Sequence, residues 1–325
     1  MTPSSTAVAH PNIALIKYWG KRDDRLILPA TSSLSLTLDV HPTTTTVALA
    51  ETDSASLDGA PMTGDALERV VRFLDLVREL AGSDARASVV STNAGPTAAG
   101  LASSASGFAA LAAAAAHAYG LDLDERALSR LARRGSGSAS RSIYPGFAQW
   151  HAGTDDESSF AEPVEAPGID AAMVVAVVDG GPKHVSSRAA MRETVRTSPF
   201  FAAWIDSSAV DLADLRAALA AGDLPTVGDV AERNAMRMHA TMLGAEPPVR
   251  YLSPASVAVL DRVRQLRAEG VGAWATMDAG PNVKVLTDRA DAERVRAAVA
   301  ELEVTSSLLV AGSGPGVAVR EGALA

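Results

Sequence analysis

The chain has 325 residues, a hydrophobic fraction of 47% and a formal net charge of −9, which fits a globular protein with one large domain or two of ordinary size. This acidity makes nucleic acids and anionic membranes poor partners for the surface as a whole. The absence of cysteine excludes disulfides and thiol nucleophiles, and the six histidines form no close pairs that would predict a zinc site.

Neither a membrane span nor a secretory signal is predicted. The longest apolar run, residues 108–116, falls far short of the ~20 residues that cross a bilayer. The N-terminus lacks a basic segment followed by an apolar one. We therefore expect a cytoplasmic protein.

The first half of the chain is predicted to mix strands and helices. Residues 34–40 and 43–50 alternate and are joined by His41-Pro42, which predicts a β-hairpin. Periodicity then predicts, in order, a helix at 65–81, a strand at 86–92, helices at about 104–118 and 124–134, a strand at 146–151 and an exposed loop at 153–168.

The second half is predicted to be mainly helical. A continuous apolar run at 173–178 predicts a buried strand. It is followed by predicted helices at about 187–198, 201–221, 225–243 and 255–269, strands at 273–277 and 283–286, a helix at about 289–302 and a strand at 308–311. We place a boundary near residue 180, which gives domains of residues 1–180 and 181–325.

Residues 10–22, His-Pro-Asn-Ile-Ala-Leu-Ile-Lys-Tyr-Trp-Gly-Lys-Arg, concentrate a scarce residue type. The chain has only four lysines, and two of them flank a Tyr–Trp pair: Lys17, Tyr18, Trp19 and Lys21. Burial alone would explain the aromatic pair. An ammonium group, however, is a natural point-charge partner for phosphate, so the segment indicates a phosphate-binding site.

Residues 96–107, Pro-Thr-Ala-Ala-Gly-Leu-Ala-Ser-Ser-Ala-Ser-Gly, are small and lead into the alanine-rich stretch 108–113. This pattern predicts a glycine-turned loop at a helix N-terminus, where unpaired N–H groups and a positive dipole attract phosphate. The loop lacks both the ending of a Walker A motif and the spacing of a dinucleotide-binding loop. A capped, tightly packed buried helix remains the alternative.

Residues 132–142, Ala-Arg-Arg-Gly-Ser-Gly-Ser-Ala-Ser-Arg-Ser, mix arginines with serines. Such a stretch could be a flexible connector between helices. Guanidinium and hydroxyl groups together, however, suit a diphosphate or a carboxylate. The segment is therefore a second candidate for anion binding.

Residues 277–285, Met-Asp-Ala-Gly-Pro-Asn-Val-Lys-Val, place Asp278 in a turn between two predicted strands. Taken alone, an Asp in such a turn is most often an acceptor for the local backbone. The segment becomes a candidate for function only when it is considered together with the three preceding segments.

Together, NIALIKYWGK, PTAAGLASSAS, RRGSGSASRS and DAGPN resemble, in order and in spacing, the diphosphomevalonate decarboxylase family of the GHMP kinase superfamily. The resemblance runs from about residue 6 to about residue 310. A fifth segment, 183–191, also resembles the family, although Ala190 stands where the family usually has Gly. The resemblance implies an α+β, GHMP-kinase-like fold, with an N-terminal half like ribosomal protein S5 domain 2, a ferredoxin-like C-terminal half and the active site between them.

The resemblance also implies a reaction: ATP-dependent decarboxylation of (R)-5-diphosphomevalonate to isopentenyl diphosphate, through phosphorylation of the 3-hydroxyl. Asp278 would accept the hydroxyl proton, and Lys17 would neutralise charge on the transferring phosphoryl group. Arg141 would hold the substrate carboxylate, and Asn12 would orient Arg141.

Further residues are implied as contacts of the two substrates. The substrate diphosphate would be bound by Tyr18, Lys21, Ser136, Ser138 and Arg188. ATP would lie on the phosphate loop and its surroundings, at Gly100, Ala102, Ser103, Ser104, Ser106, Ser187, Ser91 and Asn93. Mg²⁺ would be held mainly by phosphates rather than by a protein-built site. Lys183 and His184 are interpreted as solvated surface residues, and a homodimer is expected from the family.

Two other functions stay open on the residues alone. A kinase that phosphorylates a mevalonate-type hydroxyl would keep the phosphate loop and Asp278 but could dispense with Arg141 and the diphosphate contacts. A non-catalytic metabolite-binding protein would tolerate loss of Asp278 or Lys17. The presence of all these residues favours the decarboxylase.

Overall fold

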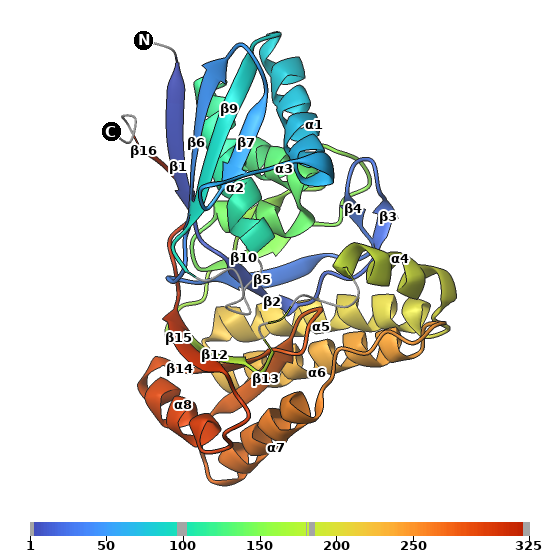
Figure 1. The fold of residues 1–325 in the computed structure, drawn as a ribbon. Coiled ribbons are helices and arrows are strands. Elements are labelled where there is room, and N and C mark those ends of the chain that lie inside the picture. The colour runs from blue at the N-terminus through green and yellow to red at the C-terminus, as the bar shows by residue number, and fades with distance from the viewer. Residues whose placement is uncertain (1–2, 96–102, 180, 182–185, 321–325) are drawn as a thin grey trace.

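The computed structural model describes residues 3–95, 103–179, 181 and 186–320, and it places two halves one above the other (Figure 1). Both halves combine helices with sheet that is antiparallel except for the parallel pair β7–β9, so the predicted α+β class is confirmed. A small sheet lies between the two halves (Figure 1). The phosphate-loop residues 96–102, which include Gly100 and Ala102, lie outside the described part, as do Lys183 and His184.

The N-terminal half is built on a sheet with strand order β16-β1-β6-β9-β7-β8. Its strands are β1 (Ser4–Ala9), β6 (Thr43–Ala50), β7 (Ser54–Leu57), β8 (Ala60–Pro61), β9 (Arg86–Asn93) and β16 (Ala318–Arg320). Its helices are α1 (Gly64–Ala81), α2 (Ser103–Ala118) and α3 (Glu125–Gly135). Helix α2 packs on β1 and β6, and its alanines allow it to be buried on nearly every side.

The middle sheet has the order β11-β10-β5-β2. It consists of β2 (Asn12–Ile16), β5 (Ser33–Thr37), β10 (Phe147–Trp150) and β11 (Ala161–Pro163), and all residues of the first three strands are buried. The 3₁₀ segment η1 (Gly137–Ile143) packs against it. A separate hairpin, β3 (Lys21–Asp23) with β4 (Leu28–Pro29), projects beside α4 (Figure 1).

The C-terminal half has an antiparallel sheet with strand order β13-β14-β12-β15. Its strands are β12 (Ala171–Val177), β13 (Ala273–Met277), β14 (Val283–Asp288) and β15 (Ser307–Gly312). Its helices are α4 (Ser187–Thr197), α5 (Phe201–Ala221), α6 (Leu224–Leu243), α7 (Pro254–Ala268) and α8 (Ala292–Ala300), the last preceded by the short η2 (Arg289–Asp291).

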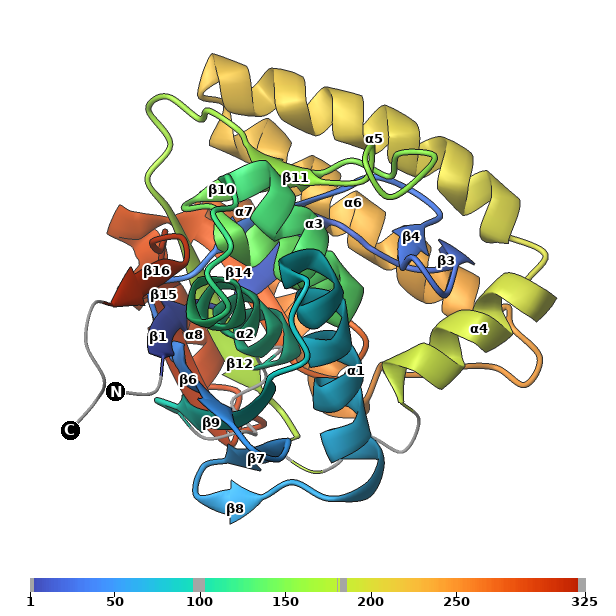
Figure 2. The same ribbon diagram turned by 90° about the horizontal axis from the view of Figure 1, so that it is seen from above.

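The residues of strand β12 form a continuous apolar run because both faces of its sheet are covered. Met173 joins a cluster with α5 and α6, whereas the next residue, Val174, joins a cluster with α7 and α8. Helices α5 and α6 run side by side across one face (Figure 2). A strand that is buried on both faces loses the alternation of polar and apolar residues.

Most predicted elements are confirmed, including each predicted helix and the strands that correspond to β9, β10, β12, β13, β14 and β15. The predicted hairpin of residues 34–40 and 43–50 is wrong. Strand β5 pairs with β2 and β10, whereas β6 pairs with β1 and β9, so the two segments belong to different sheets. Between them His41 takes φ 47°, and the chain passes from one sheet to the other instead of folding back on itself.

The predicted loop at 153–168 contains one short strand, β11, which extends the middle sheet by pairing with β10. The predicted division near residue 180 stays a prediction, and the strand pairing points to an earlier position. Strand β12 pairs with β14 and β15, and β16 returns to pair with β1. We therefore propose a boundary between β11 and β12, with the last strand belonging to the N-terminal half.

Candidate active site

A cavity of about 670 Å³ lies between the two halves. Twelve of the predicted site residues line it: Asn12, Lys17, Tyr18, Lys21, Ser103, Ser104, Ser136, Ser138, Arg141, Ser187, Arg188 and Asp278. They come from segments that are up to about 260 residues apart along the chain. The structure thus brings together the four segments that the sequence singled out and the fifth.

Asp278 and Lys17 meet at the inner end of this cavity. Asp278 follows β13 and Lys17 follows β2, and the Lys17 Nζ lies 2.8 Å from Asp278 Oδ1. Lys17 is 1% exposed and also donates to the Ala14 carbonyl oxygen at 2.7 Å. Burial lowers the pKa of Lys17, and the Asp278 carboxylate acts in the opposite direction.

A buried polar network holds the backbone of Lys17. Its N–H donates to Asn234 Oδ1 at 2.8 Å, and the Asn234 amide in turn donates to Asp211 Oδ2 at 3.0 Å. Asp211 is fully buried on α5 and also accepts from Arg233 and Arg237 on α6. Helices α5 and α6 therefore fix the position of a residue from the N-terminal half.

Lys284 belongs to this site although the sequence analysis gave it no role. It is buried on β14, and its Nζ lies 3.5 Å from Asp278 Oδ2, so each oxygen of the carboxylate faces a different ammonium group. The available signal was the scarcity of lysine, because Lys284 is one of only four.

His239 on α6 is a second buried group beside this carboxylate. It is 2% exposed, and its Nε2 is buried without a hydrogen-bond partner among the described residues. Burial lowers the pKa of His239 to about 4, and Lys17 acts in the same direction. The imidazole is therefore neutral at neutral pH.

Arg141 is held rigidly in η1. Its Nε donates to Ser35 Oγ at 2.9 Å and its Nη1 to Ser33 Oγ at 2.5 Å. Its Nη2 lies 3.3 Å from Asn12 Oδ1, the contact expected for an orienting residue. Burial lowers the pKa of Arg141 to about 10. The two serines were missed by the sequence analysis, although they lie two residues apart on β5 and so share one face.

Asn12 is itself fixed by two donated hydrogen bonds. Its Nδ2 donates to Ser142 Oγ at 2.8 Å and to the Ser138 carbonyl oxygen at 2.9 Å. Because both bonds lead to η1, Asn12 ties β2 to the segment that carries Arg141.

The outer end of the cavity carries hydroxyl groups and more exposed cations. Ser136 and Ser138 have their hydroxyl oxygens 3.5 Å apart, and the ring of Tyr18 packs edge-on against Trp150 at 4.8 Å. Gly137 approaches that pair so closely that an added Cβ would lie 2.7 Å from Trp150, which explains a glycine there. Burial raises the pKa of Tyr18, so its hydroxyl remains a donor.

Arg69 on α1 is a further cation of the outer end that the sequence analysis missed. It donates to the Gly135 carbonyl oxygen at 2.8 Å, and its guanidinium lies 4.4 Å from the centre of the Phe108 ring. It faces the cavity together with Lys21 and Arg188.

The predicted nucleotide contacts divide into two groups. Ser103 and Ser104, at the start of α2, line the cavity, and so does Ser187 at the start of α4. Ser91, Asn93 and Ser106, the remaining predicted contacts within the described residues, do not line it. Ser106 Oγ lies 2.7 Å from Thr43 Oγ1, Ser91 Oγ lies 2.9 Å from Thr45 Oγ1, and Asn93 Oδ1 accepts from Thr43 Oγ1 at 2.9 Å.

The departure at Ala190 causes no break in the backbone. Ala190 lies inside α4, where it is fully buried against an aromatic cluster that includes Trp19 and Trp204. Ser186 caps the helix by accepting from the Ala189 N–H at 3.3 Å. A helix interior suits alanine better than glycine.

No cluster of three or more His, Cys, Asp or Glu side chains that could hold a metal ion occurs in the described part of the chain. Within the same residues, no helix is long and apolar enough to span a membrane. The inner end of the cavity is lined by Asp278, Lys17 and Arg141, and Lys284 contacts the same carboxylate, which suits proton transfer beside developing negative charge.

Two family models cover most of the chain. Residues 9–161 match a diphosphomevalonate decarboxylase-like N-terminal domain, and residues 173–308 match a mevalonate 5-diphosphate decarboxylase C-terminal domain. The diphosphomevalonate decarboxylase of Homo sapiens is 36% identical over 307 residues, which span 87% of this chain and 76% of the human protein.

Solved structures give the same result. The mevalonate diphosphate decarboxylase of Staphylococcus aureus is 43% identical and superposes with a TM-score of 0.95, over 99% of both chains. The structure of MDDEF in complex with MVAPP, AMPPCP and magnesium is 47% identical, with a TM-score of 0.94, over 99% of this chain and 100% of that one.

Proposed function

The chain belongs to the diphosphomevalonate decarboxylase family, and from that premise we propose how its residues carry out the ATP-dependent decarboxylation of (R)-5-diphosphomevalonate. The products are isopentenyl diphosphate, ADP, phosphate and CO₂, a step of isoprenoid biosynthesis. The observation that carries the proposal is one cavity that holds the Lys17–Asp278 pair and a buried Arg141 together.

Phosphorylation of the substrate comes first, because a tertiary hydroxyl is a poor leaving group. Asp278 accepts the proton of the 3-hydroxyl as its oxygen attacks the γ-phosphorus of ATP. Lys17 and Lys284 face the two oxygens of this carboxylate, and Lys17 lines the cavity, where its charge offsets negative charge on the transferring group.

Decarboxylation follows departure of the new 3-phosphate, which leaves positive character at C3. The electrons of the C–C bond to the carboxylate relieve it as CO₂ leaves and the double bond forms. Arg141 holds the carboxylate in line for this step, and Ser33, Ser35 and Asn12 keep its guanidinium in one orientation.

The outer end of the cavity binds the substrate diphosphate. Tyr18, Ser136 and Ser138 supply hydroxyl donors, and Lys21 and Arg188 supply charge. These diphosphate contacts, together with the buried Arg141 at the inner end, favour a decarboxylase over a kinase that stops at phosphorylation. A simple hydroxyl kinase would not need an arginine that holds the substrate carboxylate.

ATP is proposed to lie with its phosphates at the N-terminus of α2, near Ser103 and Ser104, and close to Ser187. That MDDEF was solved with AMPPCP and magnesium supports the binding of a nucleotide and a metal ion by this chain. Magnesium supplies charge neutralisation when bound, and phosphate oxygens would be its main ligands. Assembly as a homodimer remains a prediction.

One assay tests the whole proposal. ADP and CO₂ are measured together with mevalonate 5-diphosphate and with mevalonate 5-phosphate. We expect one ADP and one CO₂ per turnover, dependence on a divalent ion, and preference for the diphosphate. ADP release from the diphosphate without CO₂ would instead identify a kinase.

A further inference from the structure

A second cavity, of about 400 Å³, opens beside the outer end of the active-site cavity. Its lining residues belong to α1, the end of α3, the β3–β4 hairpin and α4, elements whose positions Figures 1 and 2 show. Lys21, Arg69 and Arg188 line both cavities, so the two spaces meet at Lys21 and Arg188, the cations assigned to the substrate diphosphate, and at Arg69. The outer part, lined by Arg25, Arg72, Arg134 and Arg192, is here named the basic groove.

Positive charge dominates this second cavity although the chain as a whole is acidic. Among the described residues, its lining contains seven cations but only two carboxylates, Asp24 and Asp75. Burial lowers the pKa of Arg69 to about 10, and Arg188 and Arg72 act in the same direction because like charges repel. An anion placed among these groups would relieve that repulsion.

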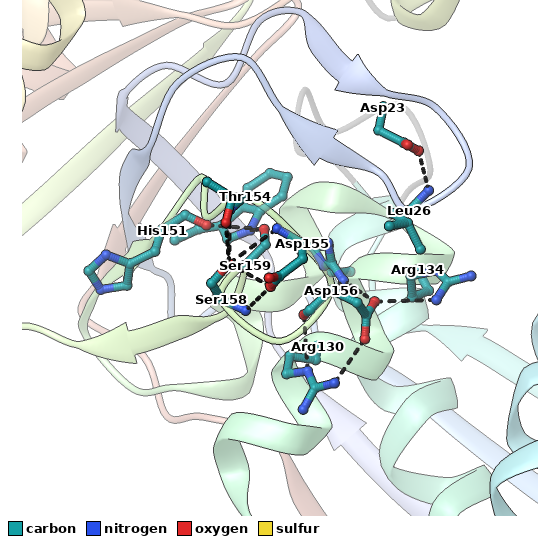
Figure 3. Close-up of polar contacts among 12 residues, drawn as sticks. Asp23, Leu26, Arg130, Arg134, His151, Thr154, Asp155, Asp156, Ser158 and Ser159 are labelled. Atoms are coloured by element: carbon teal, nitrogen blue, oxygen red, sulfur yellow. Dashed lines mark hydrogen bonds and ion pairs between the residues drawn. The ribbon is translucent and has the colours of Figure 1, made fainter.

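None of these seven cations has a carboxylate partner of its own that is buried with it, among the described residues. Arg25 and Arg188 make no hydrogen bond or ion pair with another residue of the described chain. Arg72 pairs only with the exposed Glu68, at 3.2 Å. Arg134 turns toward Asp156, 3.3 Å away (Figure 3), and Lys21 and Arg192 share one carboxylate, Asp24.

Asp24 lines the second cavity and contacts Lys21, which lines both cavities. Its Oδ1 lies 2.9 Å from Lys21 Nζ, and its Oδ2 lies 3.3 Å from Arg192 Nε on α4. The turn that carries it is fixed by the Leu26 N–H, which donates to Asp23 Oδ1 at 2.6 Å (Figure 3). Asp24 and a substrate phosphate would therefore compete for the same ammonium group.

We propose that the basic groove is an anion-binding approach site that receives the diphosphate end of the substrate and passes it to Lys21 and Arg188. The proposal rests on the proposed function, which supplies the diphosphate. A concave surface of one charge sign raises the local concentration of an anionic ligand and its association rate. No bond forms or breaks in the groove, so its charges act on capture of the substrate and not on the chemical steps.

The test removes charge from the groove without touching the catalytic or diphosphate-binding residues. In the triple variant Arg25→Gln, Arg72→Gln, Arg192→Gln, we expect kcat/KM for diphosphomevalonate to fall about tenfold at low ionic strength, or about twofold per charge. The loss should shrink as salt is added, and kcat should stay within about twofold of wild type.

The matched control changes the same kind of charge elsewhere. Arg264 is 75% exposed and belongs to α7, which lies at the other end of the molecule from α1 and the β3–β4 hairpin (Figure 1), so Arg264→Gln should leave kcat/KM and its salt dependence unchanged. A triple variant that behaves like this control would overturn the proposal.

The variant Asp24→Asn should change kcat/KM in the opposite direction. It removes the carboxylate that competes for Lys21, so we expect kcat/KM for diphosphomevalonate to rise about two- to threefold at low salt. A fall in kcat/KM for this variant contradicts the groove proposal. If wild-type protein releases no CO₂ at all, the proposed function fails instead, so the two failures are distinguishable.

Discussion

The two ends of the active-site cavity differ in how deeply their positive charges are buried and in how firmly hydrogen bonds hold them. At the inner end, Lys17 and Arg141 are 1% and 2% exposed, and the hydrogen bonds that they donate to serine, asparagine, backbone and Asp278 oxygens hold them in place. At the outer end, Arg188 is exposed, and Lys21 is paired with a carboxylate, Asp24, that is itself about half exposed.

This difference assigns different tasks to the two ends. Charges that are already fixed need no reorganisation when the transition state forms, so the inner end should act on rate. Charges that are exposed and exchange partners readily should act on substrate capture and affinity. The variants below test that division, from the largest expected effect to the smallest.

Asp278→Asn should have the largest effect. The amide keeps the volume of the side chain but cannot accept the substrate proton, so kcat should fall by about 10² to 10⁴. It also leaves two buried ammonium groups, Lys17 and Lys284, without their counter-charge, so the thermal unfolding temperature should fall as well. Both quantities are measured on the same protein, and a near-wild-type kcat per folded molecule would remove Asp278 from the chemistry.

Arg141→Lys should lower the release of CO₂ more than the release of ADP. Lysine keeps the charge but cannot reach Ser33, Ser35 and Asn12 together while holding a carboxylate with two parallel bonds. We expect CO₂ release to fall about 100-fold and ADP release to fall less, because phosphoryl transfer depends on Lys17 and Asp278. Ser33→Ala, which removes one hydrogen bond, should give a smaller loss. Unchanged CO₂ release in Arg141→Lys would contradict the assignment.

Lys21→Ala should affect binding rather than rate. Loss of one charge-assisted contact to the diphosphate corresponds to ~1.5–3 kcal/mol, so KM for diphosphomevalonate should rise roughly 10- to 100-fold while kcat changes little. The neighbouring Arg22 is the control, because its guanidinium bonds to the Ala152 and Gly153 carbonyl oxygens outside the cavity. Equal effects of Lys21→Ala and Arg22→Ala would remove Lys21 from the site.

The burial of His239 at the inner end can be tested through the pH dependence of the unfolding free energy. The unfolded chain takes up a proton at the ordinary histidine pKa of about 6.5, whereas the folded protein does so only near pH 4. The folded state is therefore favoured above pH 6.5 and loses stability as the pH falls toward 4, by ~2 kcal/mol at pH 5. The His239→Gln variant should show a flatter decline of the unfolding free energy between pH 7 and 5. An unchanged decline would show that the imidazole is not buried as described.

The sequence predicted helices well because their signals are local. Helix α3 begins after Asp124, whose side chain accepts from the Ala127 N–H, and α1 ends at Gly82 in the left-handed region with φ 59°. Strand pairing is not local, so the residues 34–40 and 43–50 looked like a hairpin although their partners lie elsewhere in the chain.

The site shows the same division between local and long-range information. The motifs named Asp278, Lys17, Arg141 and Asn12, and these residues meet in one cavity. Arg69, Ser33 and Ser35 lie outside the motifs, and nothing in their neighbouring residues distinguishes them from ordinary strand or helix positions. Lys284 lies in the segment of Asp278, but only the scarcity of lysine marked it.

By itself, then, the sequence determined the residue types for phosphate and carboxylate chemistry, the order of the motifs and most of the helices. Only the tertiary structure decided which charges are buried and which are exposed. The reason is physical: burial and ion pairing depend on contacts between distant segments, such as Lys17 with Asp278 or Arg192 with Asp24. Those contacts decide whether a cation is held in place for catalysis or left accessible to attract the substrate.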